Sequence, residues 1–272
     1  MVNSLIDLAA YLRRIGWNDE VAPTMACLEG LVRAHTAAIP FENLNPLLGI
    51  PVELSPEALD RKIIRGGRGG YCFEQNLLFG HALRAIGFVA EGLAARVLWN
   101  QPPGTITPRT HMLLRVQLDG ADRVVDVGFG GQTLTGVLRL EPEVEQTTPH
   151  ELFRLLRQDG DWLMEARIGD SWRPLYRFDL QPQHDIDYEL ANHFVSTHPR
   201  SHFTFNLAVA RAEPGRRYAL RNREFAVHHT GGETERRVLK DATEICDLLE
   251  GVFRLRVPDH PELARRLGQL PS

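Results

Sequence analysis

The chain has 272 residues, with a hydrophobic content of 43%, a charged content of 24% and a net charge of −4. These values are typical of a globular protein and exclude a disordered chain, while the length favours two or three domains. The slightly negative charge gives no reason to expect nucleic acid or an anionic membrane as a partner, so we predict neither.

Localisation and redox chemistry follow from what the sequence lacks. The N-terminal segment has no basic and apolar regions of a signal peptide, and no stretch approaches the roughly 18 apolar residues of a membrane span. Cys27, Cys72 and Cys246 lie far apart and form no C-x-x-C pair, which argues against a disulfide framework or a cysteine zinc site. We therefore predict a cytoplasmic protein without a metal.

The first 88 residues are predicted to be mostly helical. Apolar residues recur at helical spacing over residues 4–15, where Ser4 and Asp7 are placed for a capping box. A second helix ends before Pro40, and Ser55 followed by proline opens a third. Because these three helices precede the glycine-rich turn that begins at residue 65, the helix after that turn is predicted to be the fourth.

That turn leads directly into a candidate nucleophile. Residues 65–76 read Arg-Gly-Gly-Arg-Gly-Gly-Tyr-Cys-Phe-Glu-Gln-Asn, and the helix that follows begins at Cys72 and ends near Gly87. Unpaired N–H groups and the positive dipole end at a helix start favour a thiolate and can hold an oxyanion. A cysteine can also be a small core residue, but the polar and basic neighbours of Cys72 favour the nucleophile.

The next segments are predicted strands, at residues 93–99, 111–118 and 123–127, because each is a short run rich in Val and Leu. Asp119-Gly120 is a strong two-residue hairpin signal. Pairing across that turn makes His111 and Asp126 diagonal neighbours on one face, within reach of each other. Asp126 is then expected to orient the imidazole, leaving its other nitrogen to serve a thiol.

A second glycine turn follows Asp126 and allows two interpretations. Residues 127–133 do not fit G-x-G-x-x-G, so no dinucleotide fold is predicted. The turn is either a bend between strands or an amide-lined wall that takes phosphate oxygens. In the second interpretation Gly128, Gly130 and Gly131 bind a cofactor.

The remaining elements predict a bent sheet and a small closing domain. Residues 134–180 contain further strands, which favours a β-barrel or a strongly bent sheet, and residues 187–196 look helical. His198 and His202 are four apart, but Pro199 between them argues against metal ligands on a helix. The last segment has strands predicted at 205–210 and 224–229 and helices at 242–251 and 261–268.

The sequence resembles the arylamine N-acetyltransferase family nearly end to end. The most specific block is residues 65–76, which are similar to the family signature R-x-G-R-G-G-x-C-x-E-x-N. Further similar blocks occur in the same order at residues 39–44, at His111 and the strand after it, at 125–130, and at Ser196-Thr197 with Pro199, Ser201 and Phe203.

The resemblance implies an α+β, multidomain fold with a cysteine-protease-like Cys-His-Asp triad. It implies a helical bundle at residues 1–88 that carries the nucleophile, a β-barrel at 89–186 that carries His and Asp, a connection at 187–204 and an α/β lid at 205–272. By position, Cys72 matches the nucleophile, His111 the general base and Asp126 its orienter. Residues that match the family's substrate pocket are Phe41, Val97, Phe129 and Phe203.

The activity that the resemblance implies is ping-pong acetyl transfer. Cys72 takes an acetyl group from acetyl-CoA, the co-substrate, and passes it to an arylamine, arylhydrazine or N-hydroxyarylamine. An amide synthase that uses a carrier- or CoA-bound acyl group is the nearest alternative. A cysteine hydrolase or transglutaminase is a further one, while a non-catalytic binding protein is disfavoured because all three candidate residues are present.

Overall fold

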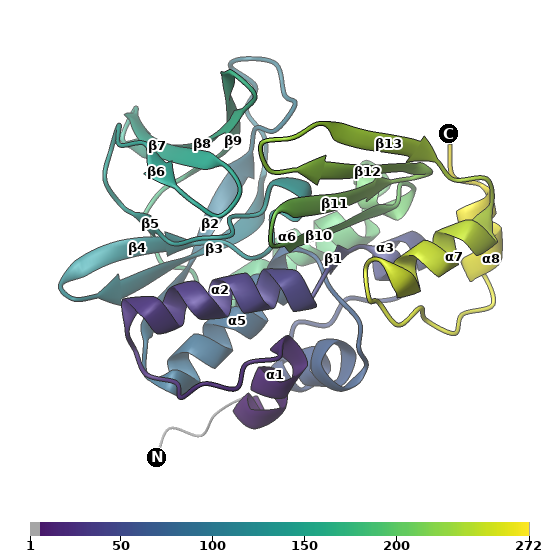
Figure 1. Cartoon of the computed structure of the whole chain (residues 1–272), viewed down its shortest axis with the longest axis horizontal. Coiled ribbons are helices and arrows are strands. Elements are labelled where there is room, and N and C mark those ends of the chain that lie inside the picture. Colours follow the sequence, from purple (N-terminus) through teal and green to yellow (C-terminus); the bar gives the residue numbers. More distant parts are fainter. Residues whose placement is uncertain (1–5, 272) are drawn as a thin grey trace.

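The computed structural model describes residues 6–271 and belongs to the α+β class, as expected. Figure 1 shows the helices of the N-terminal part below two neighbouring sheets, with the C-terminal helices at the outer end of the second sheet. The α-helices are α1 (Leu8–Ile15), α2 (Met25–Ala38), α3 (Leu44–Leu48), α4 (Pro56–Leu59), α5 (Cys72–Ile86), α6 (Asp185–Thr197), α7 (Ala242–Gly251) and α8 (Leu263–Gly268).

Eight antiparallel strands form the first sheet, which curves into a nearly closed barrel. Its two edges, at residues 138–139 and 146–147, are joined by the side-chain amide of Gln146, which accepts from the backbone N–H of Arg139 (2.7 Å) and donates to its carbonyl (3.0 Å). In spatial order the strands are β5 (Leu138–Arg139), β4 (Ala121–Val125), β3 (Arg109–Leu118), β2 (Val89–Val97), β9 (Ser171–Phe178), β8 (Asp161–Ile168), β7 (Leu152–Gln158) and β6 (Gln146–Thr147).

The second sheet has five strands and unites the two ends of the chain. A short N-terminal strand pairs with the first strand of the C-terminal part, with Phe41 opposite Ala210. The order is β1 (Phe41–Glu42), β10 (Ala208–Glu213), β11 (Arg216–Arg221), β12 (Glu224–His229) and β13 (Thr234–Val238). The prediction of strands at 205–210 and 224–229 missed β11 and β13, and the first of the predicted strands begins at Ala208 instead of at residue 205.

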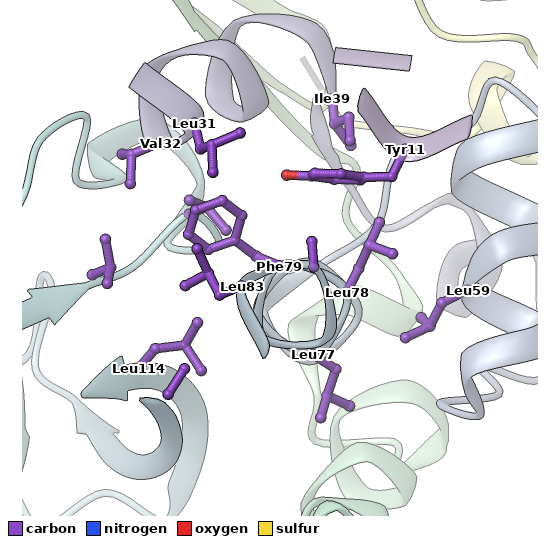
Figure 2. Packing of buried hydrophobic residues seen from close by; sticks show 14 of the residues in the cluster. Tyr11, Leu31, Val32, Ile39, Leu59, Leu77, Leu78, Phe79, Leu83 and Leu114 are labelled. Atoms are coloured by element: carbon purple, nitrogen blue, oxygen red, sulfur yellow. The ribbon is translucent and has the colours of Figure 1, made fainter. Parts of the chain in front are cut away.

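Helix α5 is the central element of the largest hydrophobic cluster. Figure 2 shows its side chains reaching toward neighbouring segments, with Phe79 and Leu83 facing α2, Leu78 near Tyr11 of α1, and Leu77 on the opposite side. The helix ends where Gly87 takes a left-handed conformation and donates to the Leu83 carbonyl (3.2 Å). Because α5 is packed on all sides, its first residue is held in a fixed place.

Two predictions about the N-terminal helices were wrong. Helix α1 begins at Leu8 because Asp7 itself is the N-cap, accepting from the Ala10 N–H (2.9 Å), and Ser4 lies outside the described residues. The cysteine helix is the fifth α-helix because α3, only five residues long, was missed. The third predicted helix is α4, which continues as a π-helical turn over Asp60–Arg65 up to the glycine turn.

The β3–β4 hairpin confirms the predicted register. Asp119 and Gly120 both have positive φ, and Leu118 faces Ala121. Ladder pairs continue to Leu114 opposite Val125, so Asp126 follows directly after β4. His111 and Asp126 are therefore diagonal neighbours on one face.

Three hydrophobic clusters fill the helical part, the barrel and the five-stranded sheet with its helices. Leu44 and Leu47 of the N-terminal segment belong to the cluster of the five-stranded sheet. The domain boundaries expected from the sequence stay a prediction. Within residues 6–271, none of the helices combines the length and the apolar character that crossing a bilayer requires.

A buried histidine in the helical core predicts an acid-sensitive stability. His35 is fully buried, and burial lowers its pKa to about 4. Its Nε2 lies 2.7 Å from Gln75 Oε1, and its Nδ1 lies 2.9 Å from the Tyr11 hydroxyl. The Gln75 oxygen only accepts, so Nε2 carries the proton and the neutral ring accepts from Tyr11.

Because the folded-state pKa lies below the unfolded value of about 6.5, the unfolded chain binds more protons at acid pH. The contribution of His35 is therefore complete above about pH 6.5 and is lost as pH falls toward 4, with a total of about 3 kcal/mol. The free energy of unfolding is measured with urea for the wild type and for His35→Gln from pH 7 to pH 4. Plotted against pH, the two values should converge at acid pH. A constant difference between the two proteins at every pH would contradict the prediction. The pKa of His81 is also lowered, but His81 is present in both proteins and should affect both alike.

Candidate active site

Cys72 is the first residue of α5, and the turn before it is built by close backbone contacts. Gly69 lies against the Pro40 carbonyl, where an added Cβ would stand 2.0 Å from the oxygen. The Glu74 carboxylate, one turn into the helix, accepts from the Tyr71 N–H (3.1 Å) and caps the helix start. Gly69 is thus required for the shape of the turn, and Cys72 is held at the positive end of the helix.

His111 and Asp126 form a buried hydrogen-bonded pair. The distance from His111 Nε2 to Asp126 Oδ2 is 2.7 Å, and the two side chains are 2% and 0% exposed. Because Nε2 is engaged by the carboxylate, Nδ1 is the nitrogen left for Cys72, whose sulfur also raises the pKa of His111. The structure thus brings together all three residues singled out from the sequence.

A β-bulge that the sequence did not reveal helps to aim this part of the strand. In the β2–β3 ladder Ala95 pairs with His111, but Arg96 pairs with Arg109, so Thr110 is an extra residue. The bulge places the Thr110 carbonyl 3.6 Å from Cys72 Sγ. Bulges re-aim groups beside functional sites, and here the carbonyl of the bulged residue contacts the thiol.

Asn76, one turn after Cys72 on α5, holds Asp126 in place. Its Nδ2 donates to Asp126 Oδ1 (3.0 Å) and to the Met112 carbonyl (2.7 Å), and its Oδ1 accepts from the Val127 N–H (3.1 Å). The Gly128 N–H also donates to Asp126 Oδ1 (2.9 Å). Asp126 therefore keeps one oxygen for the protein scaffold and the other for His111.

The charged groups of the site stabilise one another although they are buried. Burial by itself opposes protonation of His111, but the Asp126 carboxylate, and then the Cys72 sulfur, raise the pKa of His111 to about 10. Burial likewise opposes ionisation of Asp126, yet His111, Asn76 and Gly128 hold the pKa of this carboxyl below its usual value. His111 is thus protonated at neutral pH while Cys72 and Asp126 flank it.

Gly128 packs directly on the nucleophile. A Cβ at this position would stand 2.9 Å from Cys72 Cα and 2.7 Å from Asn76 Nδ2. The structure therefore gives Gly128 a packing function, whereas an added Cβ on Gly131 meets nothing within 4 Å. Gly130 has a φ of +76° and lies over the Phe41 ring.

Gly128→Ala is expected to lower turnover by about tenfold or more, because the methyl group must displace Cys72 or Asn76 and small misplacements are costly in a catalytic site. Initial rates and thermal unfolding would be measured together, with Gly251→Ala as the control because its Cβ would meet nothing within 4 Å. Wild-type turnover in Gly128→Ala would show that this contact does not position Cys72.

The predicted pocket residues lie in two groups, one of which contacts the His111 ring. Phe41 and Phe203 are in ring contact, with centroids 6.0 Å apart, and Phe129 contacts the His111 ring at 5.0 Å. Val97 pairs with Tyr176 across the β2–β9 ladder, and the Tyr176 ring contacts both His111 (4.9 Å) and Phe129 (5.0 Å). Aromatic rings thus surround the imidazole on the barrel side.

A cluster of two buried carboxylates and two half-buried basic side chains supports the turn before Cys72. The Arg68 guanidinium donates to Glu42 Oε1 (2.7 Å), and Lys62 Nζ lies 2.6 Å from Glu74 Oε1 and 3.6 Å from Glu42 Oε1. Glu42 and Glu74 are 0% and 1% exposed. Although burial opposes it, Arg68 and Lys62 hold the pKa of Glu42 below its usual value, whereas burial raises that of Glu74.

Arg68→Met is expected to destabilise the protein by about 3 kcal/mol or more, because it leaves the buried Glu42 carboxylate short of its main partner. Urea unfolding would measure the loss. Arg65→Met is the matched control, since Arg65 is 60% exposed and solvent screens its ion pairs with Asp60 and Asp7, so their loss should hardly change the free energy of unfolding. Equal losses in the two variants would contradict the prediction.

Sequence reasoning missed several of these contributors. Asn76 stands in the quoted signature, and its position one turn after the cysteine is the only local signal of its function. Tyr176 and the bulge at Thr110 depend on how distant strands pair, and no local pattern marks them.

A thiol at a helix start beside a His–Asp pair is the arrangement used by enzymes that carry an acyl group on cysteine. The model of a protein family described as N-acetyltransferase matches residues 24–261. The chain belongs to the arylamine N-acetyltransferase family.

Individual relatives are similar over nearly the whole chain. The arylamine N-acetyltransferase of Mycolicibacterium smegmatis is 44% identical over 258 residues, covering 93% of this chain and 94% of that protein. The arylamine N-acetyltransferase / N-hydroxyarylamine O-acetyltransferase of Salmonella typhimurium is 40% identical over 253 residues, covering 93% and 90%. The solved structure of Mycobacterium marinum arylamine N-acetyltransferase in complex with CoA superposes with a TM-score of 0.93 at 40% identity, covering 97% and 99%.

Proposed function

We propose that this protein is an acetyl-CoA:arylamine N-acetyltransferase that carries the acetyl group on Cys72. The observation that supports this most directly is the buried His111–Asp126 hydrogen bond beside a thiol at the first residue of α5. The names of the relatives supply the substrate classes, including N-hydroxyarylamines for the Salmonella relative.

In the first half-reaction Cys72 and His111 rest as a thiolate–imidazolium pair. The thiolate attacks the carbonyl carbon of the acetyl-CoA thioester, and the oxyanion that forms lies near the N–H groups at the start of α5. The carbon–sulfur bond to CoA then breaks, and the CoA thiolate takes the proton from His111. The products are the acetyl-enzyme and free CoA.

In the second half-reaction His111 changes from acid to base. Acetylation of Cys72 removes its negative charge and its hydrogen bond, which both raise the pKa of His111 in the free enzyme. Burial then keeps the His111 ring neutral in the acetyl-enzyme, so the lone pair of Nδ1 is available. Nδ1 accepts the proton of the amine as the amine nitrogen attacks the thioester. The amide product leaves, and the thiolate is restored.

The aromatic side chains offer a place for the acceptor. Phe41, Phe129, Phe203 and Val97 lie near His111 or near one another and are suited to the ring of an arylamine or arylhydrazine. The backbone at Gly130 and Gly131, rather than the packed Gly128, is the part of the turn suited to the CoA phosphates. A cytoplasmic location and the absence of a nucleic-acid partner stay predictions.

The test is the intact mass of the protein after brief mixing with acetyl-CoA. One added acetyl group, mapped to the peptide that contains Cys72 and discharged by an arylamine with formation of the N-acetyl product, would support the proposal. An adduct formed only from longer or carrier-bound acyl thioesters would favour an amide synthase instead. Hydrolysis of amides without any adduct from a thioester would favour a hydrolase.

A further inference from the structure

A buried arginine of the five-stranded sheet reaches across to the barrel. Arg217 of β11 is 2% exposed, and its guanidinium binds the Glu151 carboxylate with both prongs, from Nε to Oε1 (2.9 Å) and from Nη2 to Oε2 (2.6 Å). Nη2 also donates to the Thr133 carbonyl (2.9 Å). Arginine is seldom buried unless it is paired, and its planar fork fixes the direction of each bond.

Thr133 continues this connection to the candidate active site. Its hydroxyl donates to the Asp126 carbonyl (3.0 Å) and accepts from the Phe129 N–H (3.2 Å), so it closes the turn over residues 126–133. Asp126 in turn holds His111. A continuous series of buried hydrogen bonds thus leads from Arg217 through Thr133 and Asp126 to the imidazole.

A second contact fixes the hairpin that presents Arg217. The Nε2 of His150 lies 3.0 Å from the Glu213 carbonyl and 3.2 Å from the Arg216 carbonyl, both at the β10–β11 turn. Carbonyls only accept, so Nε2 carries the proton, and Nδ1 accepts from the Thr135 hydroxyl (2.8 Å). Arg217 therefore reaches the turn from a strand that is itself tied to the barrel.

We propose that Arg217 is a positioning residue, which holds the turn over residues 126–133 and through it the His111–Asp126 pair. Its consequence for acetyl transfer rests on the proposed function. The five-stranded sheet then contributes to the chemistry itself, because a side chain of β11 helps to fix the residue that orients the imidazole. Lysine cannot replace it, since one ammonium group lacks the fork that satisfies Glu151 and Thr133 together.

The test measures the reactivity of Cys72 toward iodoacetamide, which needs neither acetyl-CoA nor an amine. Arg217→Lys and Glu151→Gln are expected to slow alkylation at pH 7 by about tenfold and to change its pH profile, which depends on the titratable groups around His111, namely Cys72, Asp126 and Tyr176. The control is Arg216→Gln on the same strand, because the Arg216 side chain is 47% exposed and pairs with Glu213 and the Tyr218 ring, not with Glu151 or Thr133. It should react as the wild type does.

A purely structural contribution of Arg217 would lower the melting temperature and leave the alkylation rate and pH profile of the folded protein unchanged. That result in Arg217→Lys would overturn the inference. If this variant does not fold, alkylation of Glu151→Gln at the wild-type rate would overturn it instead. Single-turnover acetylation by acetyl-CoA is measured on the same variants and should fall in proportion. Absence of acetylation in the wild type, with slowed alkylation in the variants, would reject the proposed function but keep the positioning contribution.

Discussion

Cys72→Ala is expected to abolish acetyl transfer, by about 10⁴-fold or more, while the protein stays folded. No other thiol is expected to take over, because Cys27 lies in α2 and Cys246 in α7, whereas Cys72 is the cysteine whose sulfur raises the pKa of His111. The side chain is small and 6% exposed, so removing its sulfur should cost only about 1–2 kcal/mol of stability. Turnover with an arylamine and the intact mass after mixing with acetyl-CoA are the measurements.

Cys27→Ala is the matched control for this variant. Cys27 is 7% exposed, so the same atom is removed at nearly the same burial, but in α2 and away from His111. It should lose a similar amount of stability and keep its activity and its acetyl adduct. A folded Cys72→Ala protein that still forms the adduct would remove Cys72 from the nucleophile position.

Local signals were sufficient to predict the elements that hold the candidate site. The glycine turn and Gly87 mark the two ends of α5, because each end of a helix needs particular residues. Asp119-Gly120 fixes the hairpin, and the two-residue period of strands then determines that His111 and Asp126 share a face. These features depend only on residues close together in the sequence.

Features that depend on distant pairing could not be predicted in this way. The bulge at Thr110 exists only relative to β2, and Gly128 is required only because its turn lies against Cys72. Strand β13 has charged, exposed residues on both faces, so the alternation that predicts a half-buried strand is absent. Arg217 reads as a surface residue, and only the packing of the sheet on the barrel buries it.

Asp126→Asn is expected to lower turnover by about 10⁴-fold without unfolding the protein. The asparagine oxygen can keep the bonds from Asn76 and the Gly128 N–H, and its NH₂ group then faces His111 Nε2. The imidazole must accept that bond, which moves its proton to Nδ1, the nitrogen that serves Cys72. A ring with a proton on Nδ1 cannot act as the base for the incoming amine.

The same substitution removes the carboxylate that raises the pKa of His111, so burial then lowers that pKa. At pH 7 the imidazolium is therefore lost, and alkylation of Cys72 by iodoacetamide should slow along with turnover. Near-native turnover and alkylation in a folded Asp126→Asn protein would show that His111 works without its carboxylate partner.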